Sequence, residues 1–318
     1  MIRTSLLLLC IALSTHGINA EEWTKLPDPV LTAAHDYEQN CVCEPLVMSD
    51  QGTNKYRMYY RSGWGTTAVG VAFSDDGKTW ERYENNPITP PEDGLGGMQP
   101  WVTNDTSSSG FWYLFTTHPD WTSGVTIRRS TDGLTNWEVV ENNLSSPDGV
   151  HTYFGNRVMW KEDDLWCLLQ EVGDMKGGVW EIFLYTSKDL KDWAVRRNGK
   201  PYVELQRSAN SMYGGPSFET FNGQVVGKNE TGYYNLYYHA GSDGNLPTDI
   251  YRASSVDVVG GEWTVENGGE AILMHSGNEN KFDYDQVADP SRINDMIFYD
   301  GDNNVNATCA IGMSKKKT

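Results

Sequence analysis

A short motif recurs along the chain and limits its possible folds more than any other feature. A Ser-x-Asp segment leading to a tryptophan occurs four times, and its tryptophans are Trp80, Trp137, Trp193 and Trp263, separated by 57, 56 and 70 residues. Asp and Gly in such a segment favour a tight turn, and the Trp packs an outer strand between sheets. A repeat of this period is typical of a β-propeller, in which each unit is one four-stranded blade.

The strands expected around these turns also recur, in five units. First strands are expected at residues 43–48, 98–102, 155–159, 215–218 and 288–291, and second strands at 56–60, 111–116, 165–169, 233–238 and 296–299. The fifth unit lacks a Trp-headed outer strand, and residues 21–26 supply one. The sequence therefore predicts an all-β, five-bladed β-propeller whose ring is closed by the N-terminal strand completing the last blade. A two-sheet sandwich is the alternative, but it would not need five matched units.

The N-terminal segment 1–20 has the pattern of a secretory signal peptide. Arg3 precedes an apolar run from Leu6 to Leu13, and small residues precede Glu21. Such a segment is removed on export, which leaves residues 21–318 as a single domain in a secreted, extracellular protein. A membrane anchor is the alternative, but the run is too short and no second apolar stretch of about 18 residues follows.

Charge and modification signals fit this route. The chain has 25 Lys and Arg against 43 Asp and Glu, a net charge of −18, which disfavours nucleic acid and anionic membranes as partners. Four sequons in expected loops predict a glycoprotein, with N-linked glycans at Asn104, Asn143, Asn229 and Asn306.

Four cysteines remain after the signal peptide. Secretion permits a disulfide, and Cys41 or Cys43 is expected to pair with Cys309 because the first and last blades are neighbours in a ring. Cys41-x-Cys43 alone is poor support for zinc, since no second ligand pair follows in the sequence.

The chemistry is expected on one face of the propeller. Connections from blade to blade, and from second to third strands, open on the same face. The loops after the second strands are expected to start at Arg61, His118, Gln170, His239 and Asp300. Their sequences are rich in carboxylates, imidazoles and Trp, which suit a sugar site because aromatic faces stack on sugar rings and carboxylates bind hydroxyls or transfer protons. The expected sugar-binding side chains are Arg61, Trp64, Gln99, His118, Trp121, His151, Arg157 and His239. Arg157 would hold a substrate carboxylate or fix Asp289; both roles suit a guanidinium.

The blade pattern of X-Pro, a Tyr-rich second strand and Ser-x-Asp-Gly-x-x-Trp resembles the five-bladed glycoside hydrolase superfamily, over nearly the whole mature chain. That group includes arabinanases, β-xylosidases, invertases, levansucrases and mannoside phosphorylases. The resemblance implies a general base at Glu44, which precedes Pro45 where the family has Asp. It implies an acid in a Glu-Gly-Pro motif, but this chain has Gly214-Gly215-Pro216 after Tyr213. The Asp that tunes the acid is replaced by Asn156 or Arg157, and the invertase-type motifs are absent.

Other carboxylates are therefore candidates for the missing roles. The predicted catalytic set is Asp36, Glu44, Glu171, Asp285 and Asp289. The predicted function is a glycoside hydrolase that cleaves an oligo- or polysaccharide of neutral or weak charge by carboxylate acid/base catalysis. The alternative is a non-catalytic carbohydrate-binding propeller. A phosphorylase ranks last, because only scattered Arg residues could cradle phosphate. No cofactor is expected, and structural calcium is left open by the excess of Asp although no ligand run is diagnostic.

Overall fold

The computed structural model describes residues 21–317, apart from a set of short segments. The segments outside the described residues are 51, 53, 64–66, 90–93, 106–107, 121–123, 145–152, 174–179, 208–211, 222–223, 226–227, 242–246 and 307.

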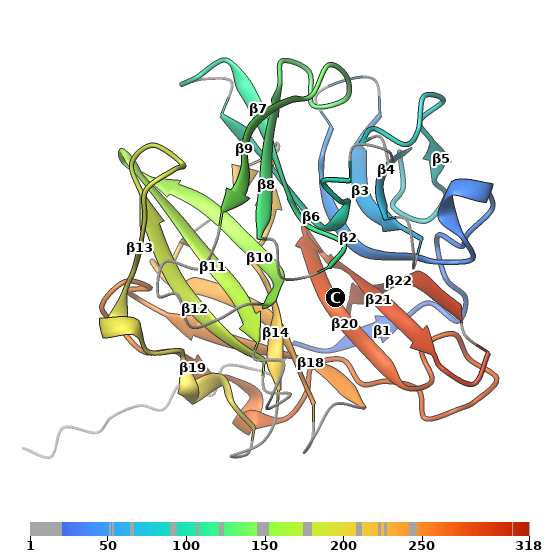
Figure 1. Cartoon of the computed structure of the whole chain (residues 1–318). Coiled ribbons are helices and arrows are strands. Elements are labelled where there is room, and N and C mark those ends of the chain that lie inside the picture. Colours follow the sequence, from blue (N-terminus) through green and yellow to red (C-terminus); the bar gives the residue numbers. More distant parts are fainter. Residues whose placement is uncertain are drawn as a thin grey trace, which may run out of the picture.

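Three separate antiparallel sheets of four strands follow one another along the chain (Figure 1). The first contains β2 (Val42–Ser49), β3 (Tyr56–Ser62), β4 (Ala68–Ser74) and β5 (Glu81–Arg82). The second contains β6 (Met98–Asp105), β7 (Phe111–Thr117), β8 (Val125–Ser130) and β9 (Glu138–Leu144). The third contains β10 (Tyr153–Glu162), β11 (Leu165–Gly173), β12 (Trp180–Ser187) and β13 (Trp193–Val195).

The remaining strands form a larger sheet built from two similar units. One unit is β14 (Tyr213–Ser217), β17 (Tyr234–Gly241), β18 (Thr248–Ser255) and β19 (Thr264–Val265). The other is β20 (Gln286–Ile293), β21 (Met296–Asn303), β22 (Thr308–Lys316) and the N-terminal β1 (Trp23–Lys25), which pairs antiparallel with β22. A single parallel pair, Thr248 with Gln286, joins the two units. The fold is thus all-β, with four-stranded units consistent with the blades of a propeller.

Short elements complete the chain. The strands β15 (Thr220–Phe221) and β16 (Gln224–Val225) form a small hairpin. Among the described residues, single-turn 3₁₀ helices lie at Asp36–Glu38, Arg197–Gly199, Val203–Leu205 and Asn267–Gly269. None of the described helices is long and apolar enough to cross a membrane.

The recurring Ser-x-Asp segments are the turns that the sequence predicts. In the first, the Asp76 Oδ1 accepts hydrogen bonds from the backbone of Lys78 and Thr79, and the Trp80 indole donates to the Gly77 carbonyl at 3.0 Å. The same contacts recur around Asp189, with the Trp193 indole donating to the Leu190 carbonyl at 3.2 Å. The Asp carboxylate also accepts from the backbone in the turns at Asp132 and Asp257, so each turn satisfies its own backbone donors. The indoles of Trp137 and Trp263 have no hydrogen-bond partner among the described residues.

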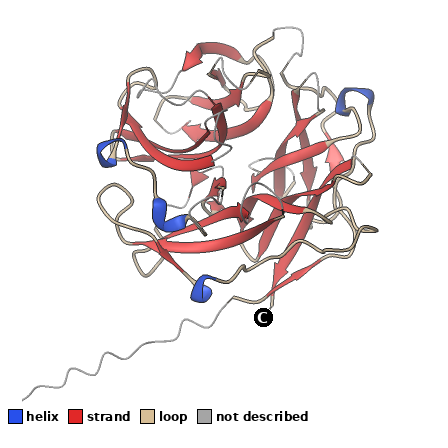
Figure 2. Cartoon of the chain, turned by 60° about the horizontal axis from the view of Figure 1, so that its bottom comes forward, coloured by secondary structure: helices blue, strands red, loops and turns tan. Residues whose placement is uncertain are grey.

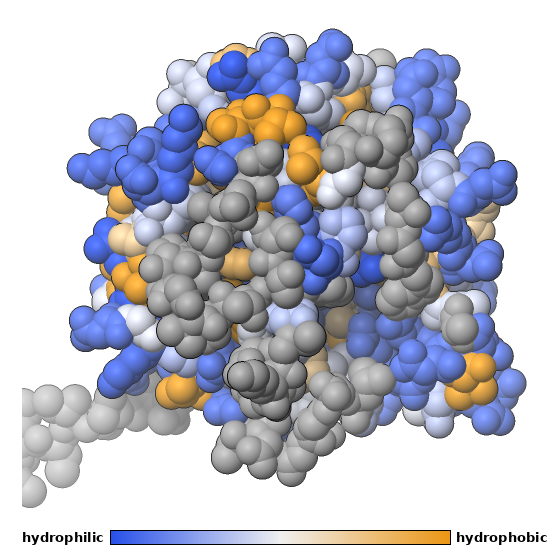
Figure 3. Space-filling model, in the orientation of Figure 1, coloured by the Kyte–Doolittle hydropathy of each residue, from blue (hydrophilic) through white to orange (hydrophobic). Residues whose placement is uncertain are grey.

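The first strands of the units pack against one another in chain order. The strands β2, β6, β10, β14 and β20 lie around the middle of the molecule, whereas outer strands such as β5 and β13 lie at its edge (Figure 1). Figure 2 shows that strands make up most of the regular structure and that the helices are short. Each first strand contacts the next, and β20 also contacts β2. The largest hydrophobic cluster fills the spaces between neighbouring sheets, with rings such as Trp101, Phe115 and Trp160 all at most 4% exposed. On the face in Figure 3, much of the described surface is hydrophilic, with separate hydrophobic areas.

Two expectations about local structure are corrected, and one open choice is settled. Segments expected as loops after the second strands, such as those starting at Gln170, His239 and Asp300, belong largely to β11, β17 and β21. Two sequon asparagines, Asn104 and Asn143, lie in strands β6 and β9 rather than in loops. The open choice of disulfide is resolved, since Cys41 is bonded to Cys309 and Cys43 is a free buried thiol.

Candidate active site

A β-bulge occurs at the same place in all five first strands. The pairing register shifts across Glu44-Pro45, Gln99-Pro100, Gly155-Asn156, Gly215-Pro216 and Asp289-Pro290. Glu44, Gln99 and Asp289 have φ of 51°, 51° and 49°, a left-handed conformation that costs about 1–3 kcal/mol for a residue other than glycine. Strain of this kind at matching positions of different units is typical of functional sites, because bulges aim side chains away from the regular strand.

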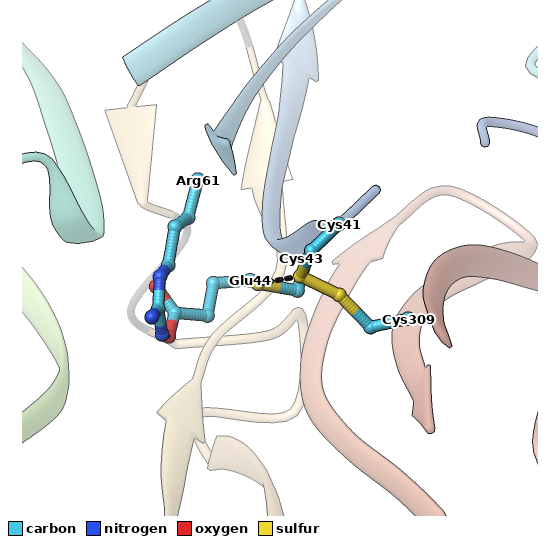
Figure 4. Close-up of a disulfide and its surroundings, with 5 residues drawn as sticks. All are labelled: Cys41, Cys43, Glu44, Arg61 and Cys309. Atoms are coloured by element: carbon cyan, nitrogen blue, oxygen red, sulfur yellow. Dashed lines mark hydrogen bonds and ion pairs between the residues drawn. A yellow bond between two sulfur atoms is a disulfide. The ribbon is translucent and has the colours of Figure 1, made fainter. Parts of the chain in front are cut away.

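Glu44 is held by two donors from different strands. Its Oε1 accepts from the Arg61 guanidinium at 2.8 Å, and its Oε2 accepts from the backbone N–H of Gln99 at 2.5 Å. Figure 4 shows the Arg61 side chain lying against the Glu44 carboxylate. Burial raises the pKa of Glu44, and the charge of Arg61 offsets this effect only in part. The carboxylate is therefore fixed in direction and is easier to protonate than one in water.

Glu171 projects from β11 into space left by two glycines. A Cβ at Gly155 or at Gly214 would collide with the Glu171 carboxylate. Its Oε2 accepts from the backbone N–H groups of Asn156 at 2.9 Å and Gly215 at 3.2 Å. A carboxylate thus occupies the place where a side chain of residue 214 would begin, which is the position at which the resemblance expected the acid.

The protonation of Glu171 is set by its surroundings. The side chain is buried, and burial raises its pKa to about 7, with the charge of Asp289 adding to the rise and His239 opposing it. A carboxylic acid with a pKa near neutrality retains its proton where an ordinary Glu has lost it.

His239 lies between Glu171 and Asp289. Its Nε2 is 3.8 Å from Glu171 Oε1, and its Nδ1 is 3.2 Å from Asp289 Oδ1. Burial would lower the pKa of His239, but the hydrogen bond and charge of Asp289 outweigh burial and raise it. Apart from this contact with the imidazole, Asp289 Oδ1 has no partner among the described residues. The backbone N–H of Asp289 donates to His239 Nδ1 at 3.2 Å, so Nδ1 acts as an acceptor in this geometry.

Glu44 and Asp289 line a small pocket that is partly open to solvent, whereas Glu171 and His239 are not among its lining residues. The bulges provide its charged lining, Glu44, Asp289 and Arg157, and the prolines after the bulges provide much of its apolar wall. The space contains both strained carboxylates of the bulge positions, so a ligand in it would meet Glu44 and Asp289 together.

Arg157 does not fix Asp289, which corrects one expected role. Its guanidinium donates to the carbonyls of Gln99 and Gly155 at 2.9 Å each, to the Thr117 hydroxyl, and to Gln170 Oε1 at 3.0 Å. Burial lowers the pKa of Arg157 to about 9. The side chain therefore ties β6 to β10 beneath the cavity.

Gln99 is likewise turned toward the neighbouring strand. In the orientation that satisfies its surroundings, its amide nitrogen donates to the carbonyls of Phe154 at 2.8 Å and Gly155 at 3.1 Å. Like the Glu44 carboxylate, this side chain links its own bulge to the next one along the chain.

Two acids near the site, the buried Asp300 and the half-buried Asp302, are not among the predicted catalytic residues. Asp300 and Asp302 lie on the same face of β21, and the Oδ1 of each has no hydrogen-bond partner within the part of the chain that is described. Burial and mutual repulsion raise the pKa of Asp300 well above its usual range, and burial with the charge of Asp289 raises that of Asp302 to about 7. The Asp-x-Asp spacing of Asp300 and Asp302 is the strand signal that could have found them, because it places both side chains on one face. The sequence instead predicts a loop for this segment.

The remaining predicted residues lie apart from this group or outside the described residues. Asp36 is exposed in the first 3₁₀ helix, and Asp285 accepts from the backbone N–H of Asn304 at 2.9 Å; neither lines the cavity. His118 Nε2 lies 2.9 Å from the Thr126 hydroxyl. Trp64, Trp121 and His151 fall in segments outside the described residues.

Two sets of side chains near the site could ligate a cation. Ligand atoms of Glu171, His239 and Asp289 all lie within 4.8 Å of one another, as do those of Asp300, Asp302 and Cys309. Calcium takes 6–8 oxygen ligands, so neither set, with its nitrogen or sulfur atom, fits the calcium that the sequence left open.

The sequence matches no protein-family model, and no curated protein matches it significantly. Solved structures match it over most of its length. An α-L-arabinofuranosidase from Podospora anserina, in complex with cellotriose, superposes with a TM-score of 0.63 at 12% identity, covering 94% of this chain and 98% of the other. An endo-arabinase from Bacteroides thetaiotaomicron gives 0.61 at 18% identity, covering 87% and 94%. A structure from a study of mannoside phosphorylases and β-1,2-mannan hydrolases gives 0.61 at 15%, covering 92% and 93%. The chain has the fold of these proteins, which confirms the resemblance at the level of fold.

Proposed function

We propose that this protein is a glycoside hydrolase whose acid, base and tuning carboxylates come from Glu171, Glu44 and Asp289. The observation that carries the proposal is the Glu171 carboxylate standing in the space above Gly214, with a pKa of about 7. Similar folds belong to proteins described as an arabinofuranosidase and an arabinase, which supports glycan hydrolysis as the reaction class.

Glu171 is the general acid in this proposal. It would donate its proton to the leaving oxygen as the glycosidic bond breaks, a task that requires a protonated carboxyl at the working pH. The two backbone N–H groups on its Oε2 fix the side chain and leave Oε1 to carry the proton.

Glu44 is the general base. It lines the cavity and holds the position before Pro45 at which the resembled family has its basic Asp. Arg61 and the Gln99 N–H direct the carboxylate, which would accept a proton from the attacking water.

Asp289 and His239 are positioning residues that adjust Glu171. The negative charge of Asp289 raises the pKa of Glu171, the effect that a middle-blade Asp has in the resembled family. His239 balances that charge by its contact with both carboxylates.

The decisive assay compares leaving groups on neutral glycans and on activated aryl glycosides. The change Glu171→Gln should lower kcat/KM on unactivated arabinan, xylan or β-mannan oligosaccharides by about 10²–10⁴-fold, and much less on an aryl glycoside whose leaving group needs no proton. The change Glu44→Gln should impair both substrates alike. The matched control is Glu138→Gln, at an exposed surface pair with Arg129. Equal losses on both substrates for Glu171→Gln would contradict the acid role.

A transplanted carboxylate tests the same idea in space. The double change Glu171→Gly with Gly214→Glu moves the carboxylate from β11 to β14, while the carboxylate stays close to the space that the Glu171 side chain occupies. The double variant should recover part of the activity that Glu171→Gly loses. Activity that stays at the level of Glu171→Gly, in a variant that folds normally, would show that the two positions are not interchangeable.

A carbohydrate-binding protein without catalysis is the second candidate. It is favoured by one observation, that both oxygens of Glu44 already accept hydrogen bonds from Arg61 and Gln99. A wild-type protein that binds neutral glycans in calorimetry but cleaves none of them would establish this alternative.

The proposal includes three further features of the protein. The five units would form a closed five-bladed ring, supported by the contacts from β2 round to β20 and by the pairing of β1 with β22. Residues 1–20 would be removed on secretion, so that the mature protein begins at Glu21 in N-terminal sequencing. The substrate would be neutral or weakly charged, since a chain of net charge −18 repels polyanions.

A further inference from the structure

Three sulfur atoms and two carboxylates gather where the first and last units meet. Cys41 and Cys43 lie at the start of β2, and Cys309 lies on β22; all three are at most 3% exposed. The sulfurs of Cys41 and Cys43 are 3.6 Å apart, and the ligand atoms of the three residues lie within 4.8 Å of one another. Figure 4 shows the Cys43 sulfur pointing toward the disulfide rather than away from it.

The acids of β21 complete the cluster. Asp302 pairs directly with Cys309 across β21 and β22, and Asp300 lies two residues earlier on the same face. One oxygen of each lies within 4.8 Å of Cys309 Sγ, and each Oδ1 lacks a hydrogen-bond partner among the described residues. Asp300 is only 5% exposed. Its unpartnered Oδ1 is therefore a buried polar atom that a bound cation or a proton would stabilise.

The disulfide alone does not account for this arrangement. A Cys41–Cys309 bond needs neither a third sulfur beside it nor two acids facing it. The nearby cation is Arg61, which already binds Glu44. In space, Cys309 adds a third sulfur to Cys41-x-Cys43, and Cys309 is shared with a second set that contains Asp300 and Asp302.

We propose that, when the Cys41–Cys309 disulfide is reduced, Cys41, Cys43 and Cys309 bind one thiophilic divalent cation of the zinc class, and that Asp302, which lies beside Cys309, moves in as the fourth ligand. Sulfurs on a tetrahedral zinc ion with Zn–S of about 2.3 Å lie about 3.8 Å apart, close to the 3.6 Å between Cys41 and Cys43. The disulfide and the metal centre are alternative states of the same sulfurs.

The chemistry requires a reductant, and a phosphine supplies it. The phosphine takes oxygen from water and becomes a phosphine oxide, while the S–S bond breaks and Cys41 and Cys309 each gain a proton. The cation then displaces the three thiol protons and binds three thiolates and the Asp302 carboxylate. Asp300 accompanies Asp302 as a nearby charge, and the positive charge of Arg61 offsets part of the excess.

Cobalt(II) provides the test, because tetrahedral Co²⁺–thiolate centres absorb visible light. The whole mature protein, reduced with a phosphine and kept free of oxygen, should develop these bands and saturate at one equivalent of Co²⁺. Zn²⁺ should abolish them, since it binds such sites more tightly. The oxidised protein should show none, because its disulfide sulfurs are not thiolates.

Matched variants identify the ligands. Cys43→Ser keeps the Cys41–Cys309 disulfide during folding, and after reduction should lose affinity by more than the roughly 10–100-fold that loss of an outer partner costs. Cys167→Ser, at the other free buried cysteine, should bind like the wild type. Asp302→Asn should weaken binding while keeping the thiolate bands.

Two results would overturn the inference. One is the absence of visible bands in the reduced wild type at one equivalent. The other is equal affinity in Cys43→Ser, or in the reduced chain held unfolded in urea, since either would mean that the folded cluster is not the site. Neither outcome depends on glycan hydrolysis.

Discussion

Glu171 offers a prediction that needs no knowledge of the substrate. Its pKa is about 7 in the folded protein against an ordinary value of 4.5, because the side chain is buried beside Asp289. The folded state therefore holds a proton that the unfolded chain releases between these values. The stability from this proton is fully present below pH 4.5 and is lost as pH rises through 7.

The size of the effect follows from the same shift. Each pKa unit is worth about 1.4 kcal/mol, so the free energy of unfolding should fall by about 3 kcal/mol between pH 4.5 and pH 8 on account of Glu171 alone. Glu171→Gln has no proton to lose there. Urea unfolding of both proteins at pH 5 and pH 8 should thus show a pH difference that is between about 2 and 3 kcal/mol smaller in the variant.

A control separates Glu171 from the many other acids of the chain. Glu138→Gln removes an exposed carboxylate and should leave the pH dependence of the wild type in place. If Glu171→Gln also keeps the full wild-type difference, the carboxyl is not protonated near neutrality, and its assignment as general acid loses its physical basis.

Other consequences can be checked alongside. Asp289→Asn should lower the pKa of Glu171, so the pH range over which urea stability falls should move toward acid. An unchanged pH range would mean that the charge of Asp289 does not affect the pKa of Glu171. Removing the disulfide, by comparing Cys41→Ala/Cys43→Ala with Cys43→Ala, should cost about 5 kcal/mol in unfolding free energy, since the bond spans 268 residues; a loss below about 1 kcal/mol would refute the chain-entropy reasoning. Asn306→Gln should remove one N-glycan from protein secreted by a eukaryotic host, measured by mass, because Asn306 is exposed in a turn; an unchanged mass would mean that the site is not glycosylated.

The architecture was predictable where the signal is local. A Ser-x-Asp turn satisfies its own backbone within a few residues, so Asp76 and Asp189 determine their turns whatever surrounds them. The X-Pro dipeptides that mark the first strands are likewise a local signal. Glu44 and Asp289 could be selected from the sequence because each precedes a proline, and both lie at bulges.

The candidate site was less predictable because its key contacts cross between strands. Glu171 on β11 stands over Gly214 on β14, and only the fold brings the two together. The glycines at 155 and 214 were a signal of an incoming side chain, but sequence alone does not say which one. The Asp-Gly-Asp segment at Asp300 predicts a turn, whereas β21 extends through it, burying Asp300 and leaving Asp302 half-buried.

The pairing of β1 with β22 has a consequence for how the protein is made. Trp23 leaves the ribosome long before its partner Lys316. Until β22 has been synthesised, β1 has no strand to pair with, and β22 without β1 presents an open edge that can pair with another chain. Glu21 also binds Lys316 and Arg252, so an affinity tag joined directly to Glu21 would disturb this late contact.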